Sequence, residues 1–596
     1  MANNSNSLGN YIVDRTESLN DTSIQDYFIG TQHSHIERLL DSEQYILEGS
    51  RGIGKTMLMR SAEINASENF GKDSILAVWV NFEESLRIAR IKIVDGSIDP
   101  FLQWTMGKIL QEVLKKCISL RPTCADQLSS RLANIFNKPT NHKMEDSFRN
   151  YVNLLDEYIK VLERGDIEDS AKLNEQSPSV KLAEILDNPV SFKEFLLQLK
   201  EDFELERIVL LFDEAAHVFS HDQQEKFFTL FKSLRNPNIA CKAAVYPGIT
   251  NYGRYFEKGQ DAKELRIDWN AKDINDINYI KSILQKRIVA FDNSYWSKLC
   301  KNDEVIQTIC ICSNGNPRFA FHIIDELDNS KVFTKSNIIY QDVIKAIRQV
   351  FENKWKDFTS LQSRLKKYES YIRESEIFVK QVIITNLRKW NENRRKQSKK
   401  LSIGFFIETN AYDSIPQIFD ILAYHNIITI DYSKKSIGHN NYGFLISLNP
   451  SILFSNRIII GVEEMDQVSI AIENNQAYYS TTPEISDLQK RVALEKECNC
   501  SNEKCDFSTN EEYNFCPKCG SKMKQEDEDV ESLYNVLRSH DIDSLRLSVA
   551  IKERLKKKFS NIGEIYDAEI DEIRMNYIQD VRIVQVKNSV IEYMTG

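Results

Sequence analysis

Residues Tyr45–Arg60 read YILEGSRGIGKTMLMR, and this order of residue types predicts a strand, a glycine-rich loop and a helix. The apolar run Tyr45–Leu47 is typical of a buried strand, and a helical pattern begins after Thr56. The loop between them has the spacing G-x-x-x-x-G-K-[ST], which binds nucleotide phosphates when a strand precedes it and a helix follows. The sequence therefore predicts an α/β P-loop nucleotide-binding domain.

Each position of this phosphate loop has a predicted role. The glycines allow the sharp turn that aims backbone N–H groups at the phosphates, and the following helix adds its positive N-terminal end. Lys55 is expected to reach the β- and γ-phosphates of ATP, and the Thr56 hydroxyl is expected to bind Mg²⁺. The predicted phosphate-binding residues are Gly49, Ser50, Arg51, Gly52, Ile53, Gly54, Lys55 and Thr56.

A second nucleotide signature is the stretch Arg207–Glu214, RIVLLFDE. Its apolar residues predict a buried parallel strand that delivers two carboxylates at its carboxyl end. Asp213 is expected to hold Mg²⁺ through water, and Glu214 is expected to orient and polarise the attacking water. An apolar run with two acids often only caps a helix, but this one lies downstream of a phosphate loop.

Composition restricts the class of protein and its partners. The 596-residue chain has room for roughly three to five domains, and its 42% hydrophobic content is ample for packed cores. The formal charge of −10 argues against a globally basic surface, so any nucleic-acid contact has to be local. The polar start MANNSNSLGN, and the lack of any apolar run near ~18 residues, predict a cytoplasmic protein without a membrane span.

Two further signals follow the acidic pair. Asn251 comes shortly after the next predicted strand, Cys241–Tyr246, and Arg318 ends the sequence NGNPR, which opens a predicted helix. The phosphate loop, the acidic pair, Asn251 and Arg318 occur in the order that AAA+ ATPases use. Over roughly residues 24–365 the chain therefore resembles the AAA+ superfamily and, within it, the origin-recognition-complex-like branch.

This resemblance implies roles for polar residues outside the two signatures. Asn251, with Thr250 as its alternative, matches the sensor 1 residue that contacts the γ-phosphate and the lytic water. Arg318 matches the sensor 2 arginine, which points back at the phosphates. Arg254 lies where such families often place an arginine finger that acts on the neighbouring subunit's nucleotide. A turn asparagine and a surface arginine are the plain alternatives for the two sensors, and the rival fingers are Arg235 and Arg266.

Changes in pattern along the chain predict a multidomain protein. The segment Tyr27–Leu40 is similar to the stretch that lines the adenine pocket of AAA+ ATPases, but Thr31 and Gln32 replace its R-E pair, and a packing helix is the alternative. The predicted segments are a flexible arm (1–23), the P-loop ATPase domain (24–270) with a helical insertion (about 97–200), a helical lid (271–365), a winged-helix-like domain (366–465), a linker with a helix (466–497), a zinc ribbon (498–525) and a helix-hairpin-helix-like domain (530–596).

The predicted winged helix would follow the lid, as it does in the origin-recognition-complex-like branch. Its expected elements are a helix through Ile377–Trp390, a second helix at Ile415–Tyr424, and strands at Ile427–Asp431 and Tyr442–Leu448 around the turn Ser433–Asn441. A basic run within it can neutralise DNA phosphates, although such runs are more often only solvated. The basic residues are Arg388, Lys389, Arg394, Arg395, Lys396, Lys399 and Lys400.

Five of the eleven cysteines crowd between Cys498 and Cys519, which indicates a metal site in a reducing compartment. The sequence C-P-K-C-G at Cys516–Gly520 places two thiolates at the spacing that tetrahedral Zn²⁺ needs. The first half of the cluster has no C-x-x-C. The predicted ligands are therefore Cys500, Cys505, Cys516 and Cys519, with Cys498 as a substitute.

The tail from Ile542 resembles, over about 55 residues, the C-terminal domain of the alpha subunit of RNA polymerase. That family uses a glycine turn in its second hairpin to approach the DNA backbone. Here the matching turn, Tyr577–Asp580, lacks glycine and adds an acid, so protein docking is at least as well supported as DNA contact. Lys556–Lys558 is a second place where the tail can meet phosphate.

The favoured prediction is an ATP-binding and hydrolysing AAA+-type switch that assembles on nucleic acid or with a separate effector protein. We expect a homo-oligomer with ATP, Mg²⁺ and Zn²⁺ as ligands and with DNA as one candidate partner. By analogy with ATPases of this build, a role in antiphage defence is included. The alternatives are a replication-initiator-like DNA-binding ATPase and a nucleotide-gated signalling scaffold that does not bind nucleic acid.

Overall fold

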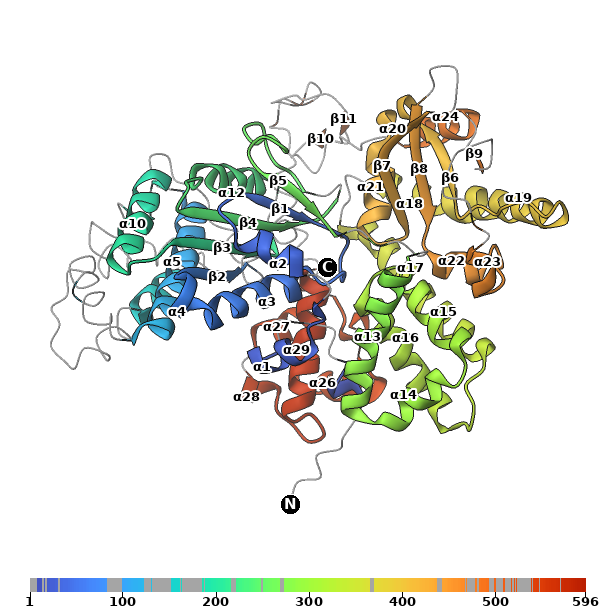
Figure 1. Ribbon diagram of the computed structural model, residues 1–596, viewed down its shortest axis with the longest axis horizontal. Coiled ribbons are helices and arrows are strands. Elements are labelled where there is room, and N and C mark those ends of the chain that lie inside the picture. The colour runs from blue at the N-terminus through green and yellow to red at the C-terminus, as the bar shows by residue number, and fades with distance from the viewer. Residues whose placement is uncertain are drawn as a thin grey trace.

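Parallel strands form the central sheet of the N-terminal half (Figure 1). The computed structural model describes residues 8–82, 99–122, 152–162, 185–215, 221–436, 442–468, 478–492 and 538–595, with gaps of up to four residues, and a few residues between these ranges. All neighbouring strands in the sheet are parallel, so their carboxyl ends share one edge. In spatial order the strands are β2 (Ile75–Asn81), β3 (Arg207–Asp213), β4 (Ile239–Val245), β1 (Tyr45–Glu48) and β5 (Lys263–Arg266).

Helices cover both faces of this sheet because alternate side chains along each strand point to opposite faces. In β3, Val209 and Leu211 pack on one side, whereas Leu210 and Phe212 pack on the other. Four of the five described strands lie where the sequence predicted them. The strand β5 is not predictable from hydrophobic pattern, because Lys263–Arg266 reads KELR and has no apolar run. The helices are α2 (His33–Leu40) and α3 (Lys55–Glu68) on the first face, and α5 (Pro100–Leu120), α10 (Pro189–Asp202) and α12 (His221–Ser233) on the second.

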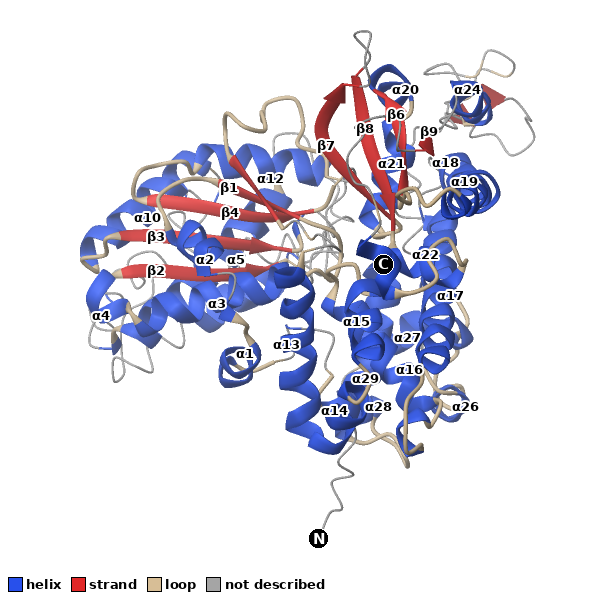
Figure 2. Ribbon diagram, turned by 45° about the vertical axis from the view of Figure 1, so that its right-hand side comes forward, coloured by secondary structure: helices blue, strands red, loops and turns tan. Residues whose placement is uncertain are grey.

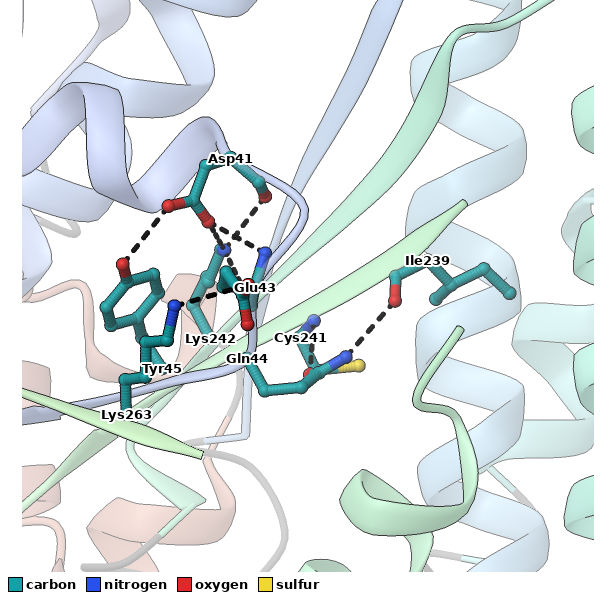
Figure 3. A network of polar contacts seen from close by, with 8 residues as sticks. All are labelled: Asp41, Glu43, Gln44, Tyr45, Ile239, Cys241, Lys242 and Lys263. Carbon is teal, nitrogen blue, oxygen red and sulfur yellow. Dashed lines mark hydrogen bonds and ion pairs between the residues drawn. The ribbon is translucent and has the colours of Figure 1, made fainter. Parts of the chain in front are cut away.

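The amino edge of the sheet holds a buried lysine in a polar network (Figure 3). The ammonium of Lys242, on β4, donates to the Asp41 carboxylate at 2.9 Å, to the Asp41 carbonyl at 3.0 Å and to the Glu43 carbonyl. The Gln44 side chain bonds the Cys241 N–H at 2.7 Å and the Ile239 carbonyl at 3.2 Å. Gln44 thereby satisfies two backbone groups of β4 in the way that a strand would.

A helical segment follows the sheet and occupies the region predicted as the lid. Its apolar residues join those of residues 369–491, which contain a second sheet, in one continuous hydrophobic core. These two parts of the chain are therefore packed as a unit. The helices are α13 (Ile274–Phe291), α14 (Asn293–Cys300), α15 (Asp303–Cys312), α16 (Pro317–Asn329) and α17 (Tyr340–Arg364).

Residues 369–491, which we call the second-sheet module, contain a mostly antiparallel sheet of order β7-β8-β6-β9 (Figure 2). The predicted long helix is observed as two helices, α18 (Glu369–Ile377) and α19 (Ile384–Lys396), which are joined by a π-helical stretch, Phe378–Ile383. Its strands are β6 (Gly404–Glu408), β7 (Ile428–Ser436), β8 (Tyr442–Leu448) and β9 (Tyr478–Tyr479), and its helices are α18 (Glu369–Ile377), α19 (Ile384–Lys396), α20 (Thr409–Ser414), α21 (Pro416–Tyr424), α22 (Pro450–Ser455), α23 (Val462–Asp466) and α24 (Thr482–Arg491).

Two predicted segments are more tightly packed than expected. The arm 1–23 is not loose throughout, because Leu8 and Ile12 are buried in the same core as α13 and α16. The segment 466–497 is not a simple linker, because β9 pairs with β6 and Leu488 of α24 is fully buried in the module. The predicted turn Ser433–Asn441 also begins later, since β7 continues to Ser436.

The C-terminal helices form a small core of their own. At the turn that matches the family's glycine, Tyr577 adopts a left-handed φ of 77° and its ring lies against the guanidinium groups of Arg554 and Arg582. The helices are α26 (Val549–Leu555), α27 (Ile562–Asp567), α28 (Ile570–Ile573) and α29 (Asp580–Thr595).

Candidate nucleotide-binding site

The phosphate loop connects the end of β1 to the start of α3 and is tightly turned. Gly52 and Gly54 have φ values of 83° and 102°, which glycine adopts without the strain that other residues incur. A Cβ atom on Gly52 would lie only 2.7 Å from Oδ1 of Asn316 and 3.2 Å from Cβ of Arg318. The loop therefore needs glycine at position 52 both for its backbone angle and for close contact with α16.

Lys55 is buried at the first position of α3, with 5% of its surface exposed. Its ammonium donates to the carbonyls of Gly49 at 2.7 Å and Ser50 at 3.1 Å, and it lies 3.8 Å from the ring centroid of Tyr246. Burial lowers the pKa of Lys55 from its ordinary value of 10.5 to about 7, although the nearby carboxylates Glu214 and Asp213 act in the opposite direction. An anion bound beside this ammonium would favour its charged form.

Asp213 and Glu214 lie at the carboxyl end of β3, as the sequence predicted for a parallel strand. The buried carboxylate of Asp213 accepts a hydrogen bond of 3.3 Å from the indole of Trp79, on β2. Glu214 has a left-handed φ of 62°, a strained conformation for a residue other than glycine. Its carboxylate accepts a hydrogen bond of 3.1 Å from the Tyr246 hydroxyl, so Tyr246 contacts both Lys55 and Glu214.

The turn NGNPR brings α16 directly onto the phosphate loop. Asn316 caps this helix by accepting from the Phe319 N–H, and its amide donates to the Arg51 carbonyl of the loop at 2.7 Å. Arg318 is on the first turn and is close enough to Lys55 to disfavour its charged form. The helical segment thus places an asparagine and an arginine beside the loop, and the sensor 2 role of Arg318 stays a prediction.

Comparison with known proteins adds a family to this geometry. A family model described as ORC-CDC6-like matches residues 13–408, about two thirds of the chain. The chain belongs to the ORC-CDC6-like family. No curated protein matches it.

Among solved structures, the ORC-CDC6-like chain matches two proteins from Aeropyrum pernix. The ORC2 protein, solved as ADPNP-ADP complexes, is 12% identical with a TM-score of 0.31, over 74% of this chain and 93% of that one. The ORC1 protein, solved in complex with DNA, is 10% identical with a TM-score of 0.27, over 74% and 96%. At these scores the assignment rests on the family model and on the predicted AAA+ core, with which the parallel sheet agrees.

Asn251 and Arg254 lie on the segment that follows β4. The Asn251 side-chain oxygen accepts from the Gly253 N–H at 3.1 Å, and the backbone N–H of Asn251 donates to the Gln224 side-chain oxygen at 2.6 Å. These bonds stabilise the local turn, and the sensor 1 role of Asn251 stays a prediction. Arg254 is exposed on this segment, which an arginine finger acting on another subunit requires.

The two rival fingers have contacts within the ORC-CDC6-like chain. Arg235 donates to the Gln260 carbonyl at 3.3 Å. Arg266 pairs with Glu264 at 2.8 Å and with Glu48 at 3.5 Å, and it lies 4.8 Å from the ring centroid of Tyr432 in the second-sheet module. Arg266 is thereby committed to an interface inside the chain.

Three residues of the site were not singled out from the sequence. Trp79 lies in a predicted strand and Asn316 in the turn before a predicted helix. Nothing in the sequence spacing indicates that Trp79 contacts Asp213 or that Asn316 contacts Arg51. Tyr246 could have been found, because it ends the predicted strand Cys241–Tyr246. Polar residues at the carboxyl ends of parallel strands share one edge of the sheet.

The residues present fit the predicted Mg²⁺ and ATP. The Asp213 carboxylate and the Thr56 hydroxyl are oxygen donors, the class of ligand that Mg²⁺ prefers. They are supplied by β3 and by the first turn of α3, which meet at the same edge of the sheet. The backbone of residues 49–54 and the Lys55 ammonium supply the donors that phosphates need.

The predicted zinc site falls largely outside the described residues. Cys500 and Cys505 are not described; Cys516 is buried, its N–H donates to the Ser521 carbonyl at 2.7 Å, and Cys519 is exposed. No group of three or more potential ligands is found in the part of the chain that the structure describes, which omits two of the four predicted ligands. The zinc ribbon therefore stays a prediction.

The basic run is partly used for internal contacts. Arg395 makes a bidentate pair with Glu464, Arg388 donates to the Asn456 carbonyl, and Arg394 donates to the Lys400 carbonyl. The remaining basic side chains are exposed on and just after α19, which projects from the body of the molecule (Figure 1). They are Lys389, Lys396, Lys399 and Lys400.

In the tail, internal contacts also occupy part of Lys556–Lys558. Lys556 pairs with Asp543 at 2.7 Å and with Asp541 at 3.0 Å, and Lys558 donates to the Glu572 carbonyl.

Within the described residues, no helix is long and apolar enough to cross a membrane.

Proposed function

We propose that this ORC-CDC6-like chain is an ATP-binding and hydrolysing switch whose chemistry takes place between the phosphate loop and the end of β3. The observation that carries the proposal is the convergence of Lys55, Asp213 and Glu214 at one edge of the sheet, with Asn316 of α16 bonded to the loop. A P-loop NTPase needs this set: a cation for the phosphates, a carboxylate for the metal and a second carboxylate for water.

Each residue then has one task. Lys55 and the N–H groups of the loop bind the β- and γ-phosphates, and Arg318 stabilises charge on the γ-phosphate from the opposite side. Thr56 and Asp213 would hold Mg²⁺, which neutralises phosphate charge when bound. Glu214 accepts a proton from the attacking water and aligns its lone pair with the γ-phosphorus.

The Glu214→Gln variant tests hydrolysis directly. It keeps the size of the side chain but cannot accept the proton, so turnover should fall at least ~10²-fold while ATP binding is retained. Glu264→Gln is the matched control, since it alters a carboxylate on β5 that pairs with Arg266. Turnover that is equal in Glu214→Gln and wild type would place the base elsewhere.

We further propose that the chain forms a homo-oligomer in which Arg254 acts on the neighbouring subunit's nucleotide. Its exposure supports this role, and arginine fingers contribute ~10³-fold or more to turnover. Arg254→Ala and Lys55→Ala proteins should each be inactive but recover partial activity when mixed. Arg235→Ala, which alters a rival finger, should keep wild-type activity. Failure to recover activity in mixed oligomers would exclude Arg254.

DNA binding by the second-sheet module is the second candidate function, and we interpret that module as winged-helix-like. The four exposed lysines on and just after α19 support it. Replacing Lys396, Lys399 and Lys400 by Ala should weaken binding to duplex DNA and reduce the slope of log K against log salt by about one for each DNA phosphate that is no longer neutralised. An ATP-dependent change of oligomer size with no DNA binding at low salt would favour the signalling scaffold instead.

We also retain the zinc ribbon as a proposal, supported by the five clustered cysteines and the C-P-K-C-G sequence. Metal analysis of freshly purified protein should find about one Zn²⁺ per chain. Cys516→Ser should lose the metal and keep ATPase activity, whereas Cys117→Ser, a substitution in α5, should keep the metal. Freshly purified protein that contains no zinc would contradict the ribbon.

A separate effector protein remains part of the proposal, because the described residues supply one catalytic constellation.

A further inference from the structure

Tyr246 occupies the centre of the candidate site and is almost completely buried. Its hydroxyl donates to Glu214 at 3.1 Å, and its ring faces the Lys55 ammonium at 3.8 Å. The Thr250 hydroxyl accepts from its N–H at 3.1 Å and donates to its carbonyl at 2.8 Å, which fixes the backbone just after β4. One tyrosine thus links the residue expected to bind phosphate with the residue expected to activate water.

A residue from the second-sheet module packs against the Tyr246 ring. Tyr424, at the end of α21, meets Tyr246 with ring centroids 5.4 Å apart and planes at 88°, a favourable edge-to-face geometry. Tyr424 is 5% exposed and belongs to the apolar core beneath the parallel sheet, unlike the rest of α21. The module therefore places an aromatic side chain inside the nucleotide-binding domain.

Two other contacts join the module to the phosphate loop. Asn316 bonds the Arg51 carbonyl of the loop, while Asn314, in the same turn, donates to the side chains of Asn426 and Thr429 in the module. On the other side, Arg266 lies between Glu48, the residue before the loop, and the Tyr432 ring. The Tyr246–Tyr424 contact is therefore part of an interface that surrounds the loop.

We propose that Tyr246 is a positioning residue for Glu214 and Lys55, and that Tyr424 holds it in place, so that the second-sheet module supports the nucleotide site of its own chain. This inference rests on the proposed hydrolysis. It gives the module a part in catalysis that does not depend on DNA, because any displacement of α21 removes the support of Tyr246.

The physical reason lies in the geometry of Glu214. Its strained backbone does not by itself select one side-chain orientation, whereas a hydrogen bond from a buried hydroxyl fixes the position of one carboxylate oxygen. Loss of that bond permits displacements of the order of ~1 Å, which cost up to ~10²-fold in rate. When only the Tyr246 hydroxyl is removed, the aromatic ring still lies against the Lys55 ammonium, so ATP binding should change little.

The first test is steady-state hydrolysis of Mg-ATP by the full-length Tyr246→Phe protein. We expect kcat to fall ~10-fold or more, with KM within about threefold of wild type, and no further loss when Tyr246→Phe is added to Glu214→Gln. Tyr252→Phe is the matched control, because it removes a hydroxyl from the same segment where the ring packs on Phe228 and Phe256. It should keep wild-type kcat.

The second test addresses Tyr424 across the interface. Tyr424→Ala should lower kcat to the level of Tyr246→Phe, and the double variant should be no slower, because both act through the same contact. Tyr424→Phe keeps the ring edge and should restore wild-type turnover, which a general loss of folding would not allow. Thermal melting of each variant checks that the fold is retained.

The outcomes separate this inference from the proposed function. The positioning role would be overturned if Tyr246→Phe kept wild-type turnover. It would also be overturned if the loss of kcat in the double variant equalled the sum of the losses in Tyr424→Ala and Tyr246→Phe, in free-energy terms. Either result would leave the proposed ATP hydrolysis intact. A wild-type protein that turns over ATP no faster than Lys55→Ala would overturn both.

Discussion

Two buried lysines lie near opposite ends of the parallel strands, and their surroundings differ. Lys242, at the amino edge, has a carboxylate partner in Asp41 and two backbone carbonyls (Figure 3). Lys55, at the carboxyl edge, donates to two carbonyls of its own loop and faces the Tyr246 ring. Burial lowers both pKa values, to about 8 for Lys242 and to about 7 for Lys55.

The two lysines differ in whether the fold supplies a counter-charge. A buried charge is costly unless a fixed counter-charge accompanies it. Lys242 has that counter-charge within the fold, whereas Lys55 has no ion pair among the residues that the structure describes. We infer that an anion from outside, the phosphate of a nucleotide, completes the environment of Lys55.

The largest expected effect is on nucleotide binding. Lys55→Ala should weaken ATP binding at least ~10²-fold, or about 2.7 kcal/mol, because the buried cation at the end of the loop is lost. Lys242→Ala should leave affinity within about threefold of wild type, since its ammonium is bonded at the opposite edge of the sheet. Equilibrium titration with ATP measures both. Equal losses in the two variants would mean that Lys55 has no special role.

The free energy of unfolding should show the reverse order, with a larger loss in Lys242→Ala than in Lys55→Ala. Lys242→Ala removes the cation that pairs with the Asp41 carboxylate and the donor to two carbonyls, although the Glu43 N–H and the Tyr45 hydroxyl still donate to Asp41, and it should lower the free energy of unfolding by about 2 kcal/mol. The effect is below the ~3–5 kcal/mol of a fully buried pair because the Asp41 side chain is 35% exposed. Lys55→Ala should cost less than about 1 kcal/mol, because it also removes an unpaired buried charge. Urea unfolding compares the variants, and a larger loss in Lys55→Ala would contradict the distinction.

The pH dependence of stability sharpens the same comparison. Between about pH 7 and pH 10.5 the unfolded chain keeps a proton on Lys55 that the folded chain has released, so stability should rise with pH. One such group contributes at most about 1.4 kcal/mol per pH unit. Lys55→Met should flatten this rise from about pH 7, and Lys242→Met only from about pH 8. Identical slopes in wild type and Lys55→Met would show that Lys55 stays charged when folded.

Much of the nucleotide site could be predicted because its residues are encoded in local spacing. A strand, a glycine turn and a helix start fix where Lys55 and Thr56 lie, and the end of an apolar strand fixes Asp213 and Glu214. The same rule, applied to the end of Cys241–Tyr246, would have added Tyr246. Asn251 was selected by family position alone, and its observed bonds fix a turn.

The rest depends on contacts between distant parts of the chain, which spacing does not encode. Tyr424 ends an apolar helix, and nothing in PQIFDILAY shows that its last residue enters another domain. The burial of Leu8 and Ile12, and of Leu488 in the expected linker, likewise depends on tertiary packing. Lys242 did carry a signal, since a lysine within an otherwise apolar strand requires a partner.

The most direct test of the central claim, that phosphate completes the environment of Lys55, is proton uptake on ATP binding. Calorimetric titration of Glu214→Gln with Mg-ATP at pH 8, in buffers of different ionisation enthalpy, counts the protons taken up without interference from hydrolysis. Because the pKa of Lys55 is about 7, its amine is mostly neutral at pH 8 and should gain about one proton when the phosphates bind. Adding Lys242→Met should leave this uptake unchanged. A binding enthalpy that is the same in every buffer would contradict the account.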